Sequence, residues 1–164
     1  MAQKEAAEQF WDFALSVYGQ DAAREAFLRL QNRDGADVPM LLWCLWCAEQ
    51  GRGVSRSVMA EAVRFSSVWR EAVVDPLRST RTTLKDGLQD IPAALSDDAR
   101  QKIAVTEQAL ERVQMEYLVE LPGTGVQADG SGIIALYADV AGLGLGVADV
   151  DTVLASLAAP VPRA

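Results

Sequence analysis

Hydrophobic residues recur every three or four positions along most of the chain, which is the spacing of one face of an α-helix. The first such stripe lies within residues 5–18 and ends at Gly19, and a second follows Asp21 and stops near Asn32. Further stripes occupy residues 58–73 and 77–88. Between them, Asp75-Pro76 predicts either a new helix or a sharp kink, because proline fits the first turn of a helix but not its interior.

Residues 38–50 form the most apolar stretch of the chain. Asp37 can cap this helix and Pro39 suits its first turn. Because the stretch is apolar all round, we expect it to lie at the centre of the fold, with Trp43 and Trp46 among the most buried side chains. We predict an all-α, single-domain helical bundle of about six to eight helices around this central helix.

The longest predicted helix covers residues 97–121, and its apolar positions form a narrow, nearly heptad seam that could support a homodimer. The positions in this seam are Ile103, Leu110, Val113, Tyr117 and Leu121. Beyond it, residues 122–164 hold seven of the twelve glycines and neither Trp nor Phe. We therefore divide the chain into a helical core domain, 1–121, and a Gly/Ala-rich C-terminal extension, 122–164. Two short helices, 133–141 and 150–158, are expected in the extension, joined by a glycine turn.

The ends and the cysteines of the sequence indicate a soluble, cytoplasmic protein. The N-terminal stretch lacks the long apolar run of a secretory signal. The longest apolar run, 38–48, spans about a dozen residues, whereas a bilayer span needs roughly 20. The two cysteines, Cys44 and Cys47, are too few for a disulfide framework. They lie inside an apolar helix, where we expect buried, unreactive thiols.

The net charge and the missing histidine make several classes of function improbable for this protein. The net charge is −8, so we expect no binding to nucleic acid. The chain contains no histidine, which removes the serine and cysteine triads and most zinc and di-iron sites. A non-enzymatic protein without cofactor or metal is therefore favoured over an enzyme.

One local excess of positive charge stands out, because residues 51–95 carry seven basic and five acidic side chains. If the helix continues through Pro76, its periodicity gathers four of the basic residues on one face: Arg70, Arg78, Arg81 and Lys85. This basic face could pair with carboxylates of the long helix, with Glu107 or Glu111 as the nearest candidates. Alternatively, it could bind an acidic protein partner or an anionic small ligand, because arginine forks hold carboxylates and phosphates. The binding role is our leading functional hypothesis.

The competing hypothesis is a carrier or enzyme for an apolar, isoprenoid-like small molecule. Aromatic side chains on the core stripes could line a cavity between helices. The candidates are Phe13, Trp43, Trp46 and Trp69.

Several short blocks, in this order along the chain, resemble a family of small proteobacterial proteins known as domain of unknown function 2390. They are Phe10-Trp11-x-Phe13-Ala14-Leu15-x-x-Tyr18, Leu30-Gln31 with Gly35-x-Asp37-Val38 and Leu41-Leu42, and Trp69-Arg70 with Pro76-Leu77-Arg78-x-x-Arg81-x-x-Leu84-Lys85. The resemblance covers roughly residues 10–121. It implies a helical bacterial protein and no particular activity.

Overall fold

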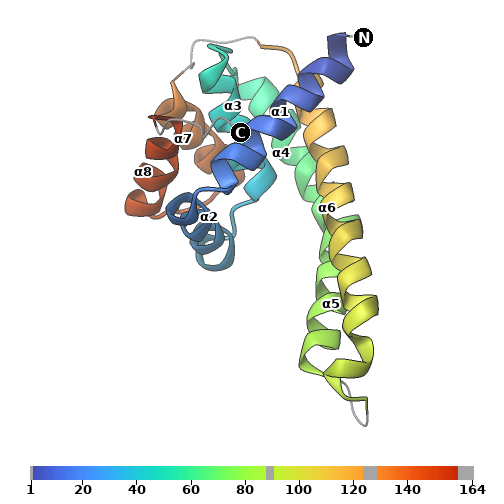
Figure 1. Cartoon of the computed structure of the whole chain (residues 1–164). Coiled ribbons are helices and arrows are strands. Elements are labelled where there is room, and N and C mark those ends of the chain that lie inside the picture. Colours follow the sequence, from blue (N-terminus) through green and yellow to red (C-terminus); the bar gives the residue numbers. More distant parts are fainter. Residues whose placement is uncertain (1, 88–90, 124–128, 159–164) are drawn as a thin grey trace. The chain divides into compact units, whose positions relative to one another are not determined.

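The helices begin and end close to the positions that the hydrophobic pattern predicts (Figure 1). This computed structural model describes residues 2–87, 91–123 and 129–158, and no β-strand occurs in those ranges. The predicted all-α, single-domain fold is confirmed. Its elements are α1 (Ala2–Tyr18), α2 (Asp21–Asp34), α3 (Val38–Glu49), α4 (Arg56–Trp69), the π-helix η1 (Arg70–Val74), α5 (Asp75–Asp86), the 3-10 helix η2 (Ala93–Ser96), α6 (Asp97–Glu120), α7 (Gly130–Ala141), α8 (Val147–Ala155) and the 3-10 turn η3 (Ser156–Ala158).

The chain divides into two compact units. Residues 1–64 and 115–164 form the first, which we call the core unit, and residues 65–114 form the second, which we call the hairpin unit. Each is described separately below.

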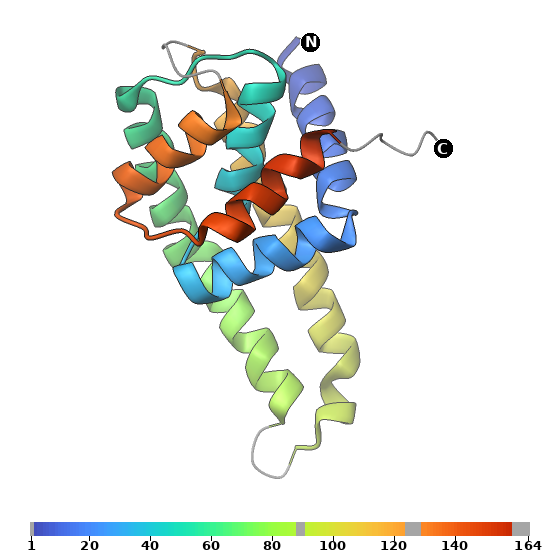
Figure 2. The ribbon, with the colours of Figure 1, turned by 90° about the vertical axis from the view of Figure 1, so that its left-hand side faces the viewer.

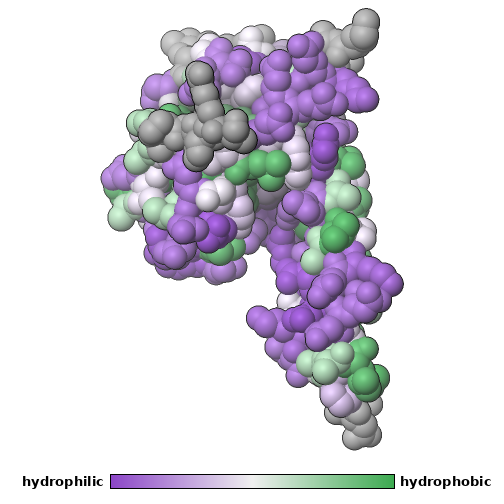
Figure 3. Space-filling model, viewed as in Figure 1, coloured by the Kyte–Doolittle hydropathy of each residue, from purple (hydrophilic) through white to green (hydrophobic). Residues whose placement is uncertain are grey.

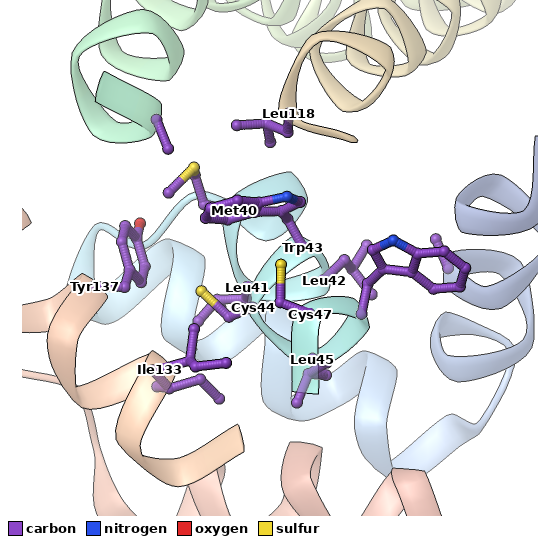
Figure 4. Close-up of a cluster of buried hydrophobic side chains, with 14 of the residues drawn as sticks. Met40, Leu41, Leu42, Trp43, Cys44, Leu45, Cys47, Leu118, Ile133 and Tyr137 are labelled. Carbon is purple, nitrogen blue, oxygen red and sulfur yellow. The ribbon is translucent and has the colours of Figure 1, made fainter. Parts of the chain in front are cut away.

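Helix α3 is the centre of the core unit, as its all-round apolar sequence predicts. Asp37 is its N-cap residue, Pro39 lies in its first turn, and residues 39–47 are all buried. Figure 4 shows Trp43 and its neighbours on α3 among side chains of other helices, including Leu118 and Ile133. The predicted burial of Trp43 and Trp46 is confirmed.

The C-terminal helices belong to the same core. Helix α7 packs on α3, and α8 packs on α2 (Figure 2). Ile133, Ile134 and Val153 are buried there, and the Tyr137 hydroxyl accepts a hydrogen bond from the Asp37 backbone N–H at 2.9 Å. The predicted glycine turn is confirmed, because α7 ends where Gly142 adopts a left-handed conformation (φ 68°) and α8 begins five residues later.

In the hairpin unit, the feature predicted as a kink or a new helix start is a π-helical turn. The Asp75 backbone N–H donates to the Arg70 carbonyl, five residues earlier. Proline has no N–H, and its ring would clash with the carbonyl four residues earlier in a regular α-helix. A wider turn ahead of Pro76 relieves that clash, and the chain continues as α5 alongside α6 (Figure 1).

The predicted seam of α6 is wrong at Val113, which is exposed. Glu107 and Gln114 are buried on the helix instead. The apolar pattern missed this inward face because two of its positions carry polar side chains. Helix α5 contains no fully buried residue, and its apolar residues Leu77 and Leu84 are only half-buried.

Candidate functional site

Ion pairs occupy the space between α5 and α6. Arg78 and Arg81 stand one turn apart on α5, and Glu107 and Glu111 stand one turn apart on α6. Together with two residues at the π-helical turn, they form the arginine–carboxylate cluster: Arg70, Asp75, Arg78, Arg81, Glu107 and Glu111.

The closest pair joins Arg81 to Glu107. The Arg81 Nε donates to Glu107 Oε1 at 2.6 Å, and its Nη2 donates to Oε2 at 3.3 Å. The Glu107 side chain is only 8% exposed and that of Arg81 is 33% exposed. This two-pronged contact is the strong form of an arginine–carboxylate pair, and the hydrogen bond to Glu107 raises the pKa of Arg81 further. The Arg81 guanidinium therefore stays charged and hydrogen-bonded to Glu107.

Arg78 connects the remaining carboxylates. Its Nη2 donates to Glu111 Oε1 at 3.0 Å, its Nη1 lies 3.4 Å from Asp75 Oδ1, and its Nε lies 4.0 Å from Glu107 Oε2. Burial raises the pKa of the Glu111 carboxyl, and Glu107 adds to that effect, while Arg78 opposes it. The Arg70 Nε lies 3.7 Å from Asp75, which is the loosest contact of the cluster.

Of the two alternatives for the basic face, the structure therefore shows internal pairing, of Arg78 with Glu111 and of Arg81 with Glu107. Three guanidinium groups face three carboxylates, so the cluster is close to electrically neutral. The guanidinium groups are already bound to carboxylates of the same chain. Lys85, the fourth residue of the predicted basic face, is exposed and makes no ion pair within the described part of the chain. Of the predicted binding residues, it is therefore the most accessible to a partner.

The hairpin closes next to Lys85. The Ser96 hydroxyl lies 3.1 Å from the Leu84 carbonyl and 3.0 Å from the Ala93 carbonyl. Gly87 has φ 80°, and a Cβ at this position would lie 3.4 Å from the Ile91 carbonyl oxygen. The run Ile91-Pro92-Ala93-Ala94-Leu95 at this end is apolar, and Leu95 is 79% exposed.

Exposed aliphatic side chains are concentrated in the hairpin unit. Among the described residues, five of the eight large hydrophobic side chains that are exposed lie in this unit: Val68, Ile91, Leu95, Val105 and Val113. Figure 3 shows hydrophobic surface at the closed end of the hairpin. Single exposed hydrophobics are common, and of these five only Ile91 and Leu95 belong to one apolar run of the sequence, 91–95.

The aromatic residues proposed for a ligand pocket fall into two groups. In the core unit, Phe13 and Trp46 lie with ring centroids 5.4 Å apart, and Trp43 is buried on the same helix as Trp46. Trp69 belongs to the hairpin unit, where its indole N–H donates to the Leu110 carbonyl at 3.0 Å and its ring stacks on Phe65.

Both cysteines are buried free thiols. Burial raises the pKa of Cys44, and it raises the pKa of Cys47 to about 12. A thiol attacks as its thiolate, so neither cysteine is reactive at neutral pH. This agrees with the prediction of unreactive thiols.

The sequence reasoning missed one ion-pair network, which joins α2 to α8 in the core unit. The Asp149 carboxylate accepts from Arg29 at 2.8 Å and from Arg33 at 3.0 Å. Asp34 accepts from Arg33 at 2.6 Å and from the Gly146 backbone N–H at 2.9 Å, and these contacts lower its pKa to about 2, Arg33 having the larger effect. Asp34 and Asp149 are separated by more than 100 residues, so no local pattern indicates their proximity.

Two other kinds of feature do not occur within the described ranges. No group of three or more Cys, Asp or Glu side chains is placed to hold a metal ion. None of the helices in that part of the chain is both long and apolar enough to cross a bilayer.

Comparison with known proteins gives one match. A family model described as "Protein of unknown function (DUF2390)" matches residues 9–118, which span α1 to most of α6. No curated protein and no solved structure matches the chain.

Proposed function

Because the chain belongs to the DUF2390 family, whose function is unknown, we propose a function from its geometry: a non-enzymatic helical binding protein that engages an acidic protein partner. The contact lies at the closed end of the hairpin, where Lys85 adjoins the apolar run 91–95. The partner that fits is a protein segment with an aliphatic side chain beside a carboxylate.

The exposed apolar end of the hairpin supports this proposal. Burying a leucine side chain is favourable by roughly 1.5–3 kcal/mol, and Leu95 is 79% exposed. Lys85 supplies a positive charge without first having to leave an ion pair in the described structure. A partner contact through Arg78 or Arg81 would instead require breaking their bonds to Glu111 and Glu107. We therefore assign the arginines to holding the hairpin together and Lys85 to contact with the partner.

We also propose that the protein is cytoplasmic. The two free thiols support this location, because small proteins of oxidising compartments commonly use their cysteines in disulfides.

Site-specific crosslinking tests the binding proposal. A photoreactive amino acid replaces Leu95 in one sample and Leu15, a 49% exposed residue of the core unit, in the control. We expect a crosslinked protein only from position 95. That protein, once identified and purified, is then titrated against wild type, Leu95→Glu, Lys85→Glu and Leu15→Glu.

The expected result is binding to wild type and Leu15→Glu, and at least tenfold weaker binding to Leu95→Glu and Lys85→Glu. Circular dichroism melts confirm that each variant is folded. Equal affinity for wild type and Leu95→Glu would show that the end of the hairpin is not the binding surface.

A further inference from the structure

A row of aliphatic residues follows the outer face of α6. Val105, Ala109 and Val113 are spaced four residues apart and are all exposed, with Val105 at 67%. Residues four apart form one ridge along a helix. The Glu107 side chain turns the other way, into the arginine–carboxylate cluster. The hairpin thus leaves this ridge, which we call the valine row, uncovered.

We propose that a second copy of this chain packs against the valine row, with the two α6 helices antiparallel about a two-fold axis at Ala109. The row reads the same in both directions, with one alanine between two valines. In an antiparallel pair, Val105 of each copy meets Val113 of the other. A two-fold interface requires this self-complementarity, in which residue i contacts j and j contacts i.

The shape of the row suits such a crossing. Ridges of residues four apart on two helices interdigitate at an angle of about −50°. The contact is then confined to the turns nearest the crossing point, which are those of the valine row. A small side chain at the centre lets the helix axes approach, and the valines on either side supply the apolar area.

Charge also favours a second copy at this place. The hairpin unit carries seven basic and eight acidic side chains, whereas the rest of the chain carries eight basic and fifteen acidic ones. Two copies repel least where their local net charge is close to zero. Glu107 and Glu111 do not add negative charge to the row, because both point away from it and pair with Arg81 and Arg78.

The association is expected to be weak. One helix crossing buries less than the roughly 1,200 Å² at the lower limit of standard stable interfaces. The dimer should therefore form only at high protein concentration, up to about 1 mM, and dissociate on dilution. This inference is independent of the proposed binding function, because it uses residues of α6 and not Lys85 or the run 91–95.

Disulfide crosslinking tests the geometry. In Ala109→Cys, the two new thiols face each other across the axis, within the reach of a disulfide. Both native cysteines are buried, so the added thiol is the accessible one. Ala104→Cys, also exposed on α6 but outside the row, is the matched control. We expect mild oxidation to convert Ala109→Cys to a covalent dimer at least tenfold faster than Ala104→Cys.

Sedimentation equilibrium tests the energetics. Wild type should show concentration-dependent dimers, Val105→Glu should sediment as a monomer, and Leu95→Glu should behave as wild type. Equal crosslinking at positions 104 and 109, or a monomeric wild type at about 1 mM, would overturn the proposal. Loss of partner binding in Leu95→Glu with intact self-association would separate the two functions experimentally.

Discussion

The pair formed by Arg81 and Glu107 provides the sharpest test of how the hairpin is held together. We expect Arg81→Met to lower the free energy of unfolding, because it keeps an aliphatic stem but removes both hydrogen bonds to Glu107. Hydrogen bonds to a charged group contribute about 1.5–3 kcal/mol. Arg81 is one-third exposed, which places the expected loss near the lower end, at about 1.5–2 kcal/mol.

A second ion pair on α6 supplies the control. Lys102 Nζ lies 2.7 Å from Asp98 Oδ2, nearly the same distance as in the Arg81–Glu107 pair, but both side chains are more than three-quarters exposed. Exposed pairs contribute about 0.2–1 kcal/mol. Lys102→Met should therefore lower the free energy of unfolding by less than Arg81→Met does. The two pairs have similar distances, so the difference in free energy comes from the greater burial of the Arg81–Glu107 pair.

Urea denaturation followed by circular dichroism measures both losses, and a double-mutant cycle with Glu107→Gln isolates the coupling between Arg81 and Glu107. The Arg81 loss should shrink in high salt more slowly than the Lys102 loss, since buried pairs are less screened. Equal losses for Arg81→Met and Lys102→Met, or a coupling energy near zero, would refute the reasoning.

Four further predictions concern the core unit. Trp43→Ala should cost about 3–5 kcal/mol, as expected for a buried aromatic residue; a thermal melt within a few degrees of wild type would contradict this. Gly146→Ala should lower the melting temperature, because the added Cβ would displace Arg33 Nη2 from its bonds to Asp34 and Asp149, whereas Gly144→Ala, with open space around it, should not. Because the folded-state pKa of Asp34 is lowered from 3.8 to about 2, its contribution to stability is complete above the unfolded value and is lost as the pH falls towards 2; Asp34→Asn should flatten the dependence of melting temperature on pH between 5 and 2. Finally, iodoacetamide at neutral pH should label Cys47 only after unfolding, which mass spectrometry can show, because burial raises its pKa to about 12.

The central helix was predictable because its signal is local. Nine consecutive positions from Pro39 to Cys47 are buried, and a run without polar residues has no face to turn to solvent. The preceding Asp37 and the early proline also fixed where the helix begins. The burial of α3, the residues at which it begins and ends, and the unreactive state of its two thiols could all be predicted from this short stretch.

Helix α6 shows where a pattern of apolar residues is insufficient. Its inward face contains Glu107 and Gln114, and its outward face contains Val105 and Val113. A hydrophobicity pattern assigns such residues to the opposite sides. The inward carboxylate is stabilised by arginines of a different helix, and this compensation is visible only when both helices are in place. The same reasoning applies to Asp34 and Gly146, whose contact depends on tertiary packing.

The packing of α7 against α3 has a consequence for the order of events on the ribosome. Helix α3 ends at Glu49 and α7 ends at Ala141, so about 90 residues are synthesised before the late helix can cover the early one. At roughly 5–20 residues per second, the surface of α3 that α7 covers stays exposed for on the order of 5–20 s, although α1 and α2, which also pack on α3, are already made. During that interval it is a natural target for a holding chaperone, and truncated chains that end before α7 should be the insoluble products of incomplete translation.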